Sequence, residues 1–209
     1  MGINFKSLES IENNLKLNPD AQLMIVTKNQ SQEVVHELIS SGYKLFGENR
    51  VQEIEKKYLY LRKVFEFELH LIGPLQTNKV RQALQIVDTI QSIDRKKIVE
   101  EILKYWSSAS RTKNFFIQIN IGNEPQKSGI SPEESLSFYK YCLEKKLPIS
   151  GLMCIPPNET DPSVYFKEMV SIKNKLNINL KLSMGMSNDY LLALEHKSNI
   201  IRIGSLIFD

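Results

Sequence analysis

The 209-residue chain carries 27 basic and 24 acidic residues, and its formal net charge of +3 is too balanced for a nucleic-acid-binding groove. Hydrophobic residues make up 42% and charged residues 24% of the chain, as in ordinary soluble globular proteins. No window approaches ~18 uninterrupted apolar residues, and the first residues form no apolar signal core. We therefore expect neither a membrane span nor a secretory leader.

Cysteine and histidine usage gives no sign of a metal site or of disulfides. Cys142 and Cys154 lack metal-ligand spacing and do not resemble a disulfide framework. The three histidines (His36, His70 and His196) are scattered and form no metal set. Free thiols are usual in reducing compartments, so we expect a cytoplasmic protein without a metal ion.

Short apolar strands alternate with amphipathic helices along the chain. After a first helix at 3–17, strands are predicted at 22–28, 44–47, 68–73, 89–92, 114–121, 149–154, 181–184 and 200–204. Helices follow the first seven strands and are predicted at 32–41, 50–63, 76–84, 95–108, 132–146, 162–176 and 188–195.

Eight strands joined by helices favour parallel pairing through crossovers. The strand–helix repeat averages about 25 residues, which suits a compact α/β protein with a single (β/α)8 TIM-type barrel. We expect one domain over 1–209, with the additional N-terminal helix covering the gap left after the last strand. A doubly wound open sheet is the alternative, but no Gly-rich fingerprint follows the first strand.

The first strand ends in a lysine. The apolar run at 23–27 is followed by Lys28 and then by the turn-forming residues Asn29 and Ser31. An amine held in a partly dry barrel mouth can form a Schiff base with an aldehyde. The alternative is a strand that exits into solvent, and general lysine behaviour alone favours it. The remaining motifs favour the Schiff base.

The last two loops predict an anion site. Ligands bind barrels at the C-terminal ends of the strands, and phosphate commonly binds after strands seven and eight. Ser187 in the first of these loops is predicted to cap the helix at 188–195, and Gly204 and Ser205 lie in the second. Strand alternation points Arg202 to the same side as Gly204. The alternatives are a simple helix cap, a C-terminal turn and an arginine paired with a buried carboxylate.

Other polar residues receive structural interpretations. Glu48 is predicted to be a helix-start acid, and His70 a core histidine bonded to the backbone. Lys56 and Lys57 are predicted to lie on a solvated face. The sequence contains no Ser-His-Asp set, carboxylate pair or Walker-type loop.

Taken together, these segments resemble the signatures of the pyridoxal phosphate homeostasis protein family (YggS/PROSC), in the family's order from about Leu23 to Phe208. The matching segments are at 27–28, 46–53, 70–79, 91–94, 120–121, 127–129, 151–153, 182–187 and 202–205. The chain departs from frequent family residues at Gln30, where many members have a second lysine, and at Arg50 and Pro74.

The resemblance implies a barrel like the N-terminal part of alanine racemase, with pyridoxal 5′-phosphate held on Lys28 as a Schiff base. Ser187, Gly204 and Ser205 would bind the phosphate by hydroxyl and backbone N–H groups. The chain ends at the eighth strand, so we expect the further domain that completes the racemase site to be absent.

By the same resemblance, Asn49 would line the cofactor pocket and Arg202 would face the pyridine nitrogen. An arginine cannot accept a proton there and would weaken the ring as an electron sink. The resemblance predicts a carrier or buffer of the cofactor in vitamin B6 homeostasis, without robust catalysis. Without the further domain, we expect a monomer. Apo-enzymes that depend on pyridoxal 5′-phosphate (PLP) are the expected partners. The alternatives are a weak enzyme of amino-acid racemase type and, less favoured, a Schiff-base aldolase.

Overall fold

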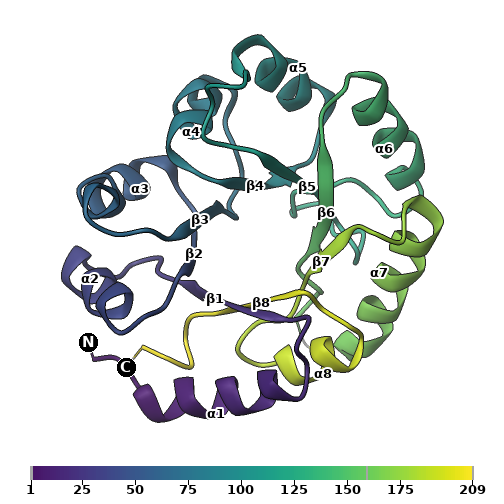
Figure 1. The fold of residues 1–209 in the computed structure, drawn as a ribbon. Helices are drawn as coiled ribbons and strands as arrows, with labels where there is room; N and C mark the ends of the chain where they lie inside the picture. The colour runs from purple at the N-terminus through teal and green to yellow at the C-terminus, as the bar shows by residue number, and fades with distance from the viewer. Residues whose placement is uncertain (1, 159, 209) are drawn as a thin grey trace.

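The structure is a computed structural model, described here for residues 2–158 and 160–208, and it is a closed barrel of parallel strands inside a ring of helices (Figure 1). The strands are β1 (Gln22–Val26), β2 (Leu45–Glu48), β3 (Glu68–Leu71), β4 (Thr89–Ile93), β5 (Asn114–Ile119), β6 (Ile149–Cys154), β7 (Lys181–Ser183) and β8 (Ile200–Ile203). They pair in sequence order, and β8 pairs with β1 to close the barrel. The predicted (β/α)8 barrel is confirmed, and the open sheet is excluded.

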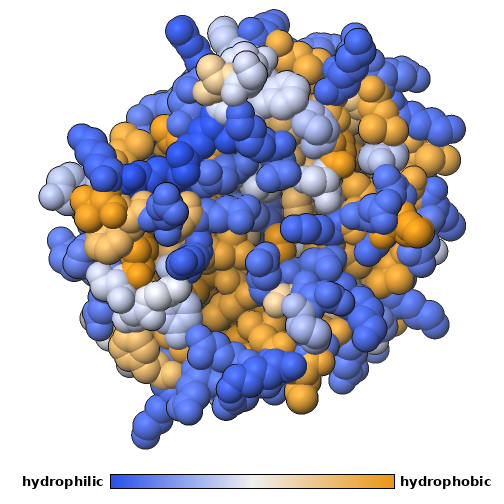
Figure 2. Space-filling view, in the orientation of Figure 1, coloured by the Kyte–Doolittle hydropathy of each residue, from blue (hydrophilic) through white to orange (hydrophobic). Residues whose placement is uncertain are grey.

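The helices of the ring follow the predicted order. They are α1 (Phe5–Lys16), α2 (Gln32–Ser40), α3 (Val51–Tyr58), α4 (Val80–Ile86), α5 (Lys96–Tyr105), α6 (Ser135–Glu144), α7 (Pro162–Leu176) and α8 (Tyr190–Glu195). Two short 3-10 helices, η1 (Leu61–Lys63) and η2 (Thr77–Lys79), flank α3 and α4. Hydrophilic side chains cover much of the face shown in Figure 2, with hydrophobic areas interspersed between them.

Helix ends differ from the prediction where the chain forms 3-10 turns in place of α-helical turns. The predicted helix at 50–63 is divided into α3 and η1, and the one at 76–84 begins as η2. The N–H of Lys79 donates to Gln76 O at 3.0 Å, and the N–H of Glu134 donates to Ser131 O at 3.2 Å ahead of α6. Both are bonds between residues three apart, and hydrophobic periodicity does not distinguish such turns from α-helix.

Helix α1 covers the side of the barrel that has no helix after β8, as predicted. It lies outside β1 and β8, between α2 and α8 (Figure 1). Its Leu8 and Ile11 side chains are buried against the core. The chain termini meet beside it, where Asn4 N–H donates to Ile207 O at 3.1 Å and Ile3 bridges Phe208.

A small apolar cluster lies in the barrel interior. Met24, Phe116 and Ile200 form it, and Met24 is the register partner of Arg202 on β8, so the two side chains lie on the same face of the sheet. Gly47 and Gly151 leave the room that this cluster needs, because a Cβ on them would meet Met24 and Phe116 respectively. The interior is therefore packed, and a ligand site can form only at its mouth.

The described residues contain neither a disulfide nor a metal-binding cluster. Cys142 and Cys154 are free and buried, and burial raises the pKa of each thiol to about 12, so both are protonated at neutral pH. Within residues 2–158 and 160–208, no cluster of His, Cys, Asp and Glu could hold a metal ion. No helix in these ranges is long and apolar enough to cross a bilayer.

The packing of α1 gives a test of the fold. Leu8→Ala removes a fully buried side chain and should lower the free energy of unfolding by about 2–5 kcal/mol, because it leaves a cavity. Leu17→Ala, at a leucine that is 82% exposed beyond the end of the same helix, should change it by less than about 0.5 kcal/mol. Urea unfolding measures both. Equal effects of the two substitutions would mean that α1 does not seal the barrel.

Candidate functional site

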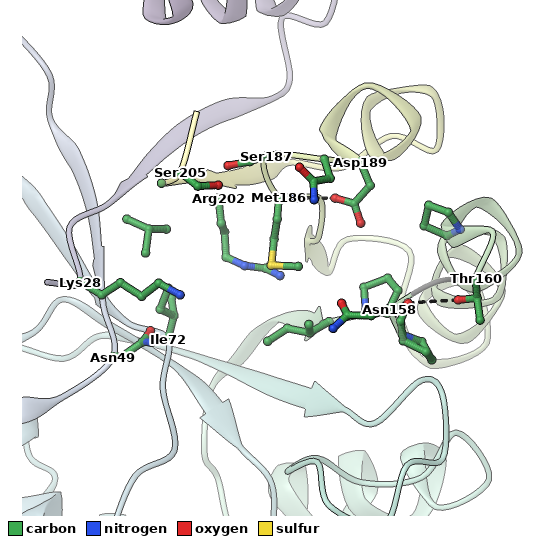
Figure 3. A pocket seen from close by; sticks show the side chains of 17 residues that line it. Lys28, Asn49, Ile72, Asn158, Thr160, Met186, Ser187, Asp189, Arg202 and Ser205 are labelled. Carbon is green, nitrogen blue, oxygen red and sulfur yellow. Dashed lines mark hydrogen bonds between the residues drawn. The ribbon is translucent and has the colours of Figure 1, made fainter. Parts of the chain in front are cut away.

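A pocket of about 470 Å³ opens where the C-terminal ends of the strands meet the following loops. It contains every residue that the sequence analysis assigned to a cofactor: Lys28, Asn49, Ser187, Arg202, Gly204 and Ser205. Figure 3 shows the labelled members of this set around a common space. The six residues come from the ends of β1, β2, β7 and β8, so barrel closure brings together segments up to 177 positions apart in the chain.

Lys28 stands in a turn just beyond β1. The N–H of Gln30 donates to Thr27 O at 3.1 Å, and Asn29 has a left-handed φ of 64°, which asparagine tolerates better than most residues. The Thr27 side chain is fully buried, whereas Lys28 lines the pocket. The expected partly dry surroundings are not found, because the turn holds Lys28 at the open rim of the pocket, where it is exposed.

Arg202 is a buried member of the pocket wall. It is 3% exposed, and its guanidinium donates to Ser183 Oγ at 3.0 Å and to Cys154 O at 2.7 Å. Burial lowers the pKa of the guanidinium, an effect that Cys154 and Asp189 oppose, but an arginine keeps its charge. Within the described ranges no carboxylate pairs with it, so the alternative of a buried ion pair is wrong. Its remaining donor capacity can serve a ligand.

The loops after β7 and β8 form one wall together. Ser187 Oγ accepts a long hydrogen bond, 3.4 Å, from the N–H of Leu206 in the other loop. At Gly204 a Cβ would stand 3.2 Å from Val26 O, so a side chain there would crowd β1. The wall thus combines a hydroxyl with backbone that a ligand can approach closely, the combination that anions favour.

The predicted capping role of Ser187 is wrong. Helix α8 begins at Tyr190, and its N-cap is Asp189 rather than Ser187. Asp189 Oδ1 accepts a hydrogen bond from Met186 N–H at 2.6 Å, which closes the turn before the helix. The helix starts two residues later than predicted because this turn takes up the intervening residues. Ser187 therefore lies in the pocket wall and not at the helix end.

The sequence analysis assigned no role to the residues on the far side of the pocket. Asn158 and Thr160, from the loop after β6, and Asp189 line it opposite Lys28 (Figure 3). Ile72, which follows β3, adds an apolar side chain near Asn49. All lie in segments that follow strand ends. The rule that located Lys28 would have included these segments, but it does not choose among the polar residues of a long loop.

Two charged residues beside the pocket also lie where the sequence analysis did not place them. Glu48 is the last residue of β2, is 1% exposed and pairs with Lys57 at 2.8 Å. Lys57 is thus buried, whereas the side chain of the adjacent Lys56 is 74% exposed, as predicted. The helical phase of α3 turns one lysine of the pair toward the barrel and the other toward water.

His70 is a buried core histidine, as predicted, but its partners are side chains and not the backbone. Its ring nitrogens lie 2.7 Å from Gln91 Nε2 and 2.6 Å from Glu68 Oε1. The hydrogen bond with His70 lowers the pKa of the Glu68 carboxyl, against a smaller opposing effect of burial. This network belongs to the barrel wall and is not part of the pocket lining.

Comparison with known proteins places this barrel and pocket in a family. The family model described as "Alanine racemase, N-terminal domain" matches residues 7–209. Pyridoxal phosphate homeostasis proteins of Aquifex aeolicus (strain VF5) and Pasteurella multocida (strain Pm70) are 39% and 36% identical to the chain. Each match covers 90% of this chain, and 86% and 85% of the respective relatives.

Solved structures agree with the sequence relatives. PipY of Synechococcus elongatus PCC7942 superimposes with a TM-score of 0.87 without PLP and 0.85 with PLP bound, at 29% and 28% identity. Each match covers 98% of this chain and 99% of PipY. Alanine racemase of Acinetobacter baumannii, at 16% identity and a TM-score of 0.76, shares the fold over 61% of its own chain. The chain belongs to the alanine racemase N-terminal domain family and, within it, to the pyridoxal phosphate homeostasis proteins.

Proposed function

We propose that the chain binds pyridoxal 5′-phosphate covalently at Lys28 and carries or buffers this cofactor in vitamin B6 homeostasis. The observation that carries the proposal is the meeting of Lys28, Arg202 and the Ser187–Gly204 wall in one pocket of a protein from this family. PipY, whose fold this chain shares over nearly its whole length, has been solved with PLP bound.

The residues present fit the chemistry of this cofactor. Its phosphate needs hydrogen-bond donors, and the hydroxyls of Ser187 and Ser205 lie beside backbone that Gly204 leaves open. Its aldehyde needs a primary amine, which Lys28 supplies on the same pocket lining. Its ring needs a flat space with a polar partner, and Asn49, Ile72 and Arg202 border that space. All of these residues already lie on the pocket lining, so the backbone needs no rearrangement to bring them to the ligand.

When bound, the cofactor supplies an aldehyde that condenses with the Lys28 amine, so that a C=N bond forms and one water molecule is released. Arg202 can only donate hydrogen bonds, because its guanidinium carries no free acceptor. A pyridine nitrogen facing it would stay unprotonated, and the ring would be a poor electron sink. Arg202 therefore supports binding while opposing carbanion chemistry.

The pocket offers little for acid–base turnover. Among the described lining residues, Lys28 and Asp189 are the only side chains of the types that commonly exchange protons in catalysis, and Asp189 already accepts the Met186 N–H. Two-sided proton transfer on an amino acid needs a second base opposite the lysine. We therefore propose that the chain has no robust enzymatic activity. A weak racemase-type activity is the second candidate, favoured by the barrel shared with alanine racemases.

The wider setting is part of the same proposal. The single closed barrel supports a single-domain protein, and we propose that it works as a monomer in the cytoplasm. PLP-dependent apo-enzymes are the proposed recipients of the cofactor. Lys28 is exposed at the pocket rim, where an incoming amine could reach the cofactor's aldehyde carbon, to which Lys28 would be bound.

The first test concerns Lys28. Wild-type protein mixed with the cofactor should develop a long-wavelength absorption band that borohydride bleaches, and peptide mapping should place the reduced adduct at Lys28. Lys28→Ala should lose band and adduct and keep its fold, because the side chain is exposed. Lys56→Ala, at a solvated lysine, is the control and should behave as wild type. An equally abundant adduct in Lys28→Ala would show that another lysine carries the cofactor.

The second test concerns the phosphate. Ser187→Ala and Ser205→Ala should each weaken cofactor retention by about 1–3 kcal/mol, the usual loss for a hydrogen bond to a charged group. Equilibrium dialysis against increasing phosphate measures the effect, with Ser40→Ala on the exposed surface of α2 as control. If a variant that carries both substitutions, Ser187→Ala and Ser205→Ala, retained the cofactor as well as wild type does, the phosphate would bind elsewhere.

The third test separates carrier from enzyme. Loaded protein incubated with amino acids in deuterated water should show no Lys28-dependent loss of the α-proton signal by NMR. An alanine racemase serves as the positive control. Exchange that occurs with wild type and disappears in Lys28→Ala would favour the racemase-type alternative, while cofactor binding would stand.

A further inference from the structure

A buried ion pair lies directly behind the lysine turn. Glu48 at the end of β2 is 1% exposed and Lys57 in α3 is 5% exposed, and the Lys57 ammonium is 2.8 Å from Glu48 Oε1. Glu53, one turn earlier on α3, is a second and more exposed carboxylate at 3.6 Å from the same ammonium. The pair is on the helix side of the strands and does not line the pocket.

The Lys57 ammonium also holds the first residue of the turn that presents Lys28. It donates a hydrogen bond to Thr27 O at 3.0 Å, and this carbonyl is the one that closes the turn by accepting from Gln30 N–H at 3.1 Å. Thr27 and Lys28 are adjacent in the chain and point to opposite sides. The ammonium thus contacts the backbone from which the cofactor lysine projects.

The side chain of Thr27 is held equally firmly. Its hydroxyl donates to Glu48 Oε1 at 3.1 Å and lies 2.5 Å from the hydroxyl of Tyr58. Because the single hydroxyl proton of Thr27 is used toward Glu48, the Tyr58 hydroxyl, whose pKa burial raises far above its usual range, donates to Thr27. Both polar atoms that Thr27 presents to α3, its carbonyl and its hydroxyl, are therefore bound by the Glu48–Lys57–Tyr58 group.

The same carboxylate reaches a second residue of the pocket. Glu48 Oε2 accepts a hydrogen bond from Asn49 N–H at 3.0 Å, and Asn49 lines the pocket. One buried carboxylate therefore ties the end of β1, through Thr27 and Lys57, to the end of β2. This link adds to the backbone hydrogen bond from Thr27 N–H to Gly47 O at 3.1 Å, which also joins the ends of the two strands.

Stability alone does not account for charges at this place. Removing two ions from water is costly, and replacing a buried ion pair by packed neutral residues is often neutral or stabilising. An apolar side chain of similar shape at position 57, such as that of methionine, would fill the space, but it could not donate a hydrogen bond to Thr27 O. The ammonium thus contributes something specific to the lysine turn.

From these contacts we infer that Glu48 and Lys57 are positioning residues: the buried pair fixes the backbone of the Thr27–Lys28 turn so that the Lys28 amine meets the aldehyde of a cofactor bound in the pocket. This inference rests on the proposed function and adds to it two residues that touch no ligand. It predicts that the pair affects covalent attachment more than non-covalent binding, because it acts on Lys28 and not on the phosphate wall.

Two ligands separate the two effects. Pyridoxamine 5′-phosphate has the same ring and phosphate but an amine in place of the aldehyde, so it measures the pocket without condensation on Lys28. Pyridoxal 5′-phosphate followed by borohydride trapping measures the rate of attachment. The main variant is Glu48→Gln with Lys57→Met, which removes both charges together and avoids an unpaired buried carboxylate. Lys56→Met, at the exposed neighbour on the same helix, is the matched control.

In the double variant we expect the affinity for pyridoxamine 5′-phosphate to stay within about 2-fold of wild type. The attachment rate should fall by about 10-fold or more, because a small misplacement of a reacting group costs rate steeply. Lys57→Arg, which keeps a charged donor, should recover part of the rate. Thermal unfolding checks that each variant is folded. If the double variant does not fold, Glu48→Gln with Lys57→Gln, which also removes both charges but keeps a polar side chain at each position, replaces it in the same comparison.

Unchanged attachment in a folded variant would overturn the inference, and so would an equal loss for both ligands, which would indicate general damage to the pocket. Failure of the proposed function gives a different result. In that case the wild-type protein itself would form no adduct at Lys28, whatever the variants do.

Discussion

The pairing of β1 with β8 is the constraint on which the pocket depends. Met24 pairs with Arg202 and Ile25 with Ile203, so the turn that follows β1 lies beside the segment that follows β8. A slip of one residue in this register would turn Arg202 from the barrel mouth to the helix shell. It would also separate Lys28 from the Gly204 loop. Residues near opposite ends of the chain become one site only because the barrel closes in this register.

Strand alternation at the end of β1 then divides two tasks between neighbouring residues. Thr27 points outward and is fully buried among Glu48, Lys57 and Tyr58, whereas Lys28 points into the pocket and is exposed. A polar group inside the shell must be hydrogen-bonded to be tolerated, and here those bonds also hold the backbone next to Lys28, the lysine proposed to bind the cofactor. Anchoring and chemistry therefore use opposite faces of the same strand end.

Much of this could be predicted from the sequence, and the exceptions have physical reasons. Alternating apolar runs located all eight strands, and the rule that ligands bind at strand ends located Lys28 and Arg202. Lys57 was assigned to water because its burial depends on the rotation of α3 about its own axis, which a double lysine does not reveal. Ser187 was assigned a capping role, but a tight turn moves the helix start to Tyr190 and places Asp189 at the N-cap position, where its side chain makes no capping bond. Partners such as that of Glu48 follow from tertiary packing and have no local signal.

The same geometry fits the proposed role of a carrier that binds a cofactor without catalysing a reaction on it. A covalent site that must also release its ligand needs a reactive atom that other amines can approach, and the Lys28 side chain is exposed. It also needs a ring environment that does not draw the bound group into further reaction, and the buried Arg202 guanidinium can donate hydrogen bonds but cannot accept a proton. In the proposed carrier, the backbone is held from the helix side and the Lys28 amine is accessible from the pocket, so attachment would occur at one defined position. Such attachment would also be reversible, since an imine exchanges with free amines or water without any general base at the α-carbon.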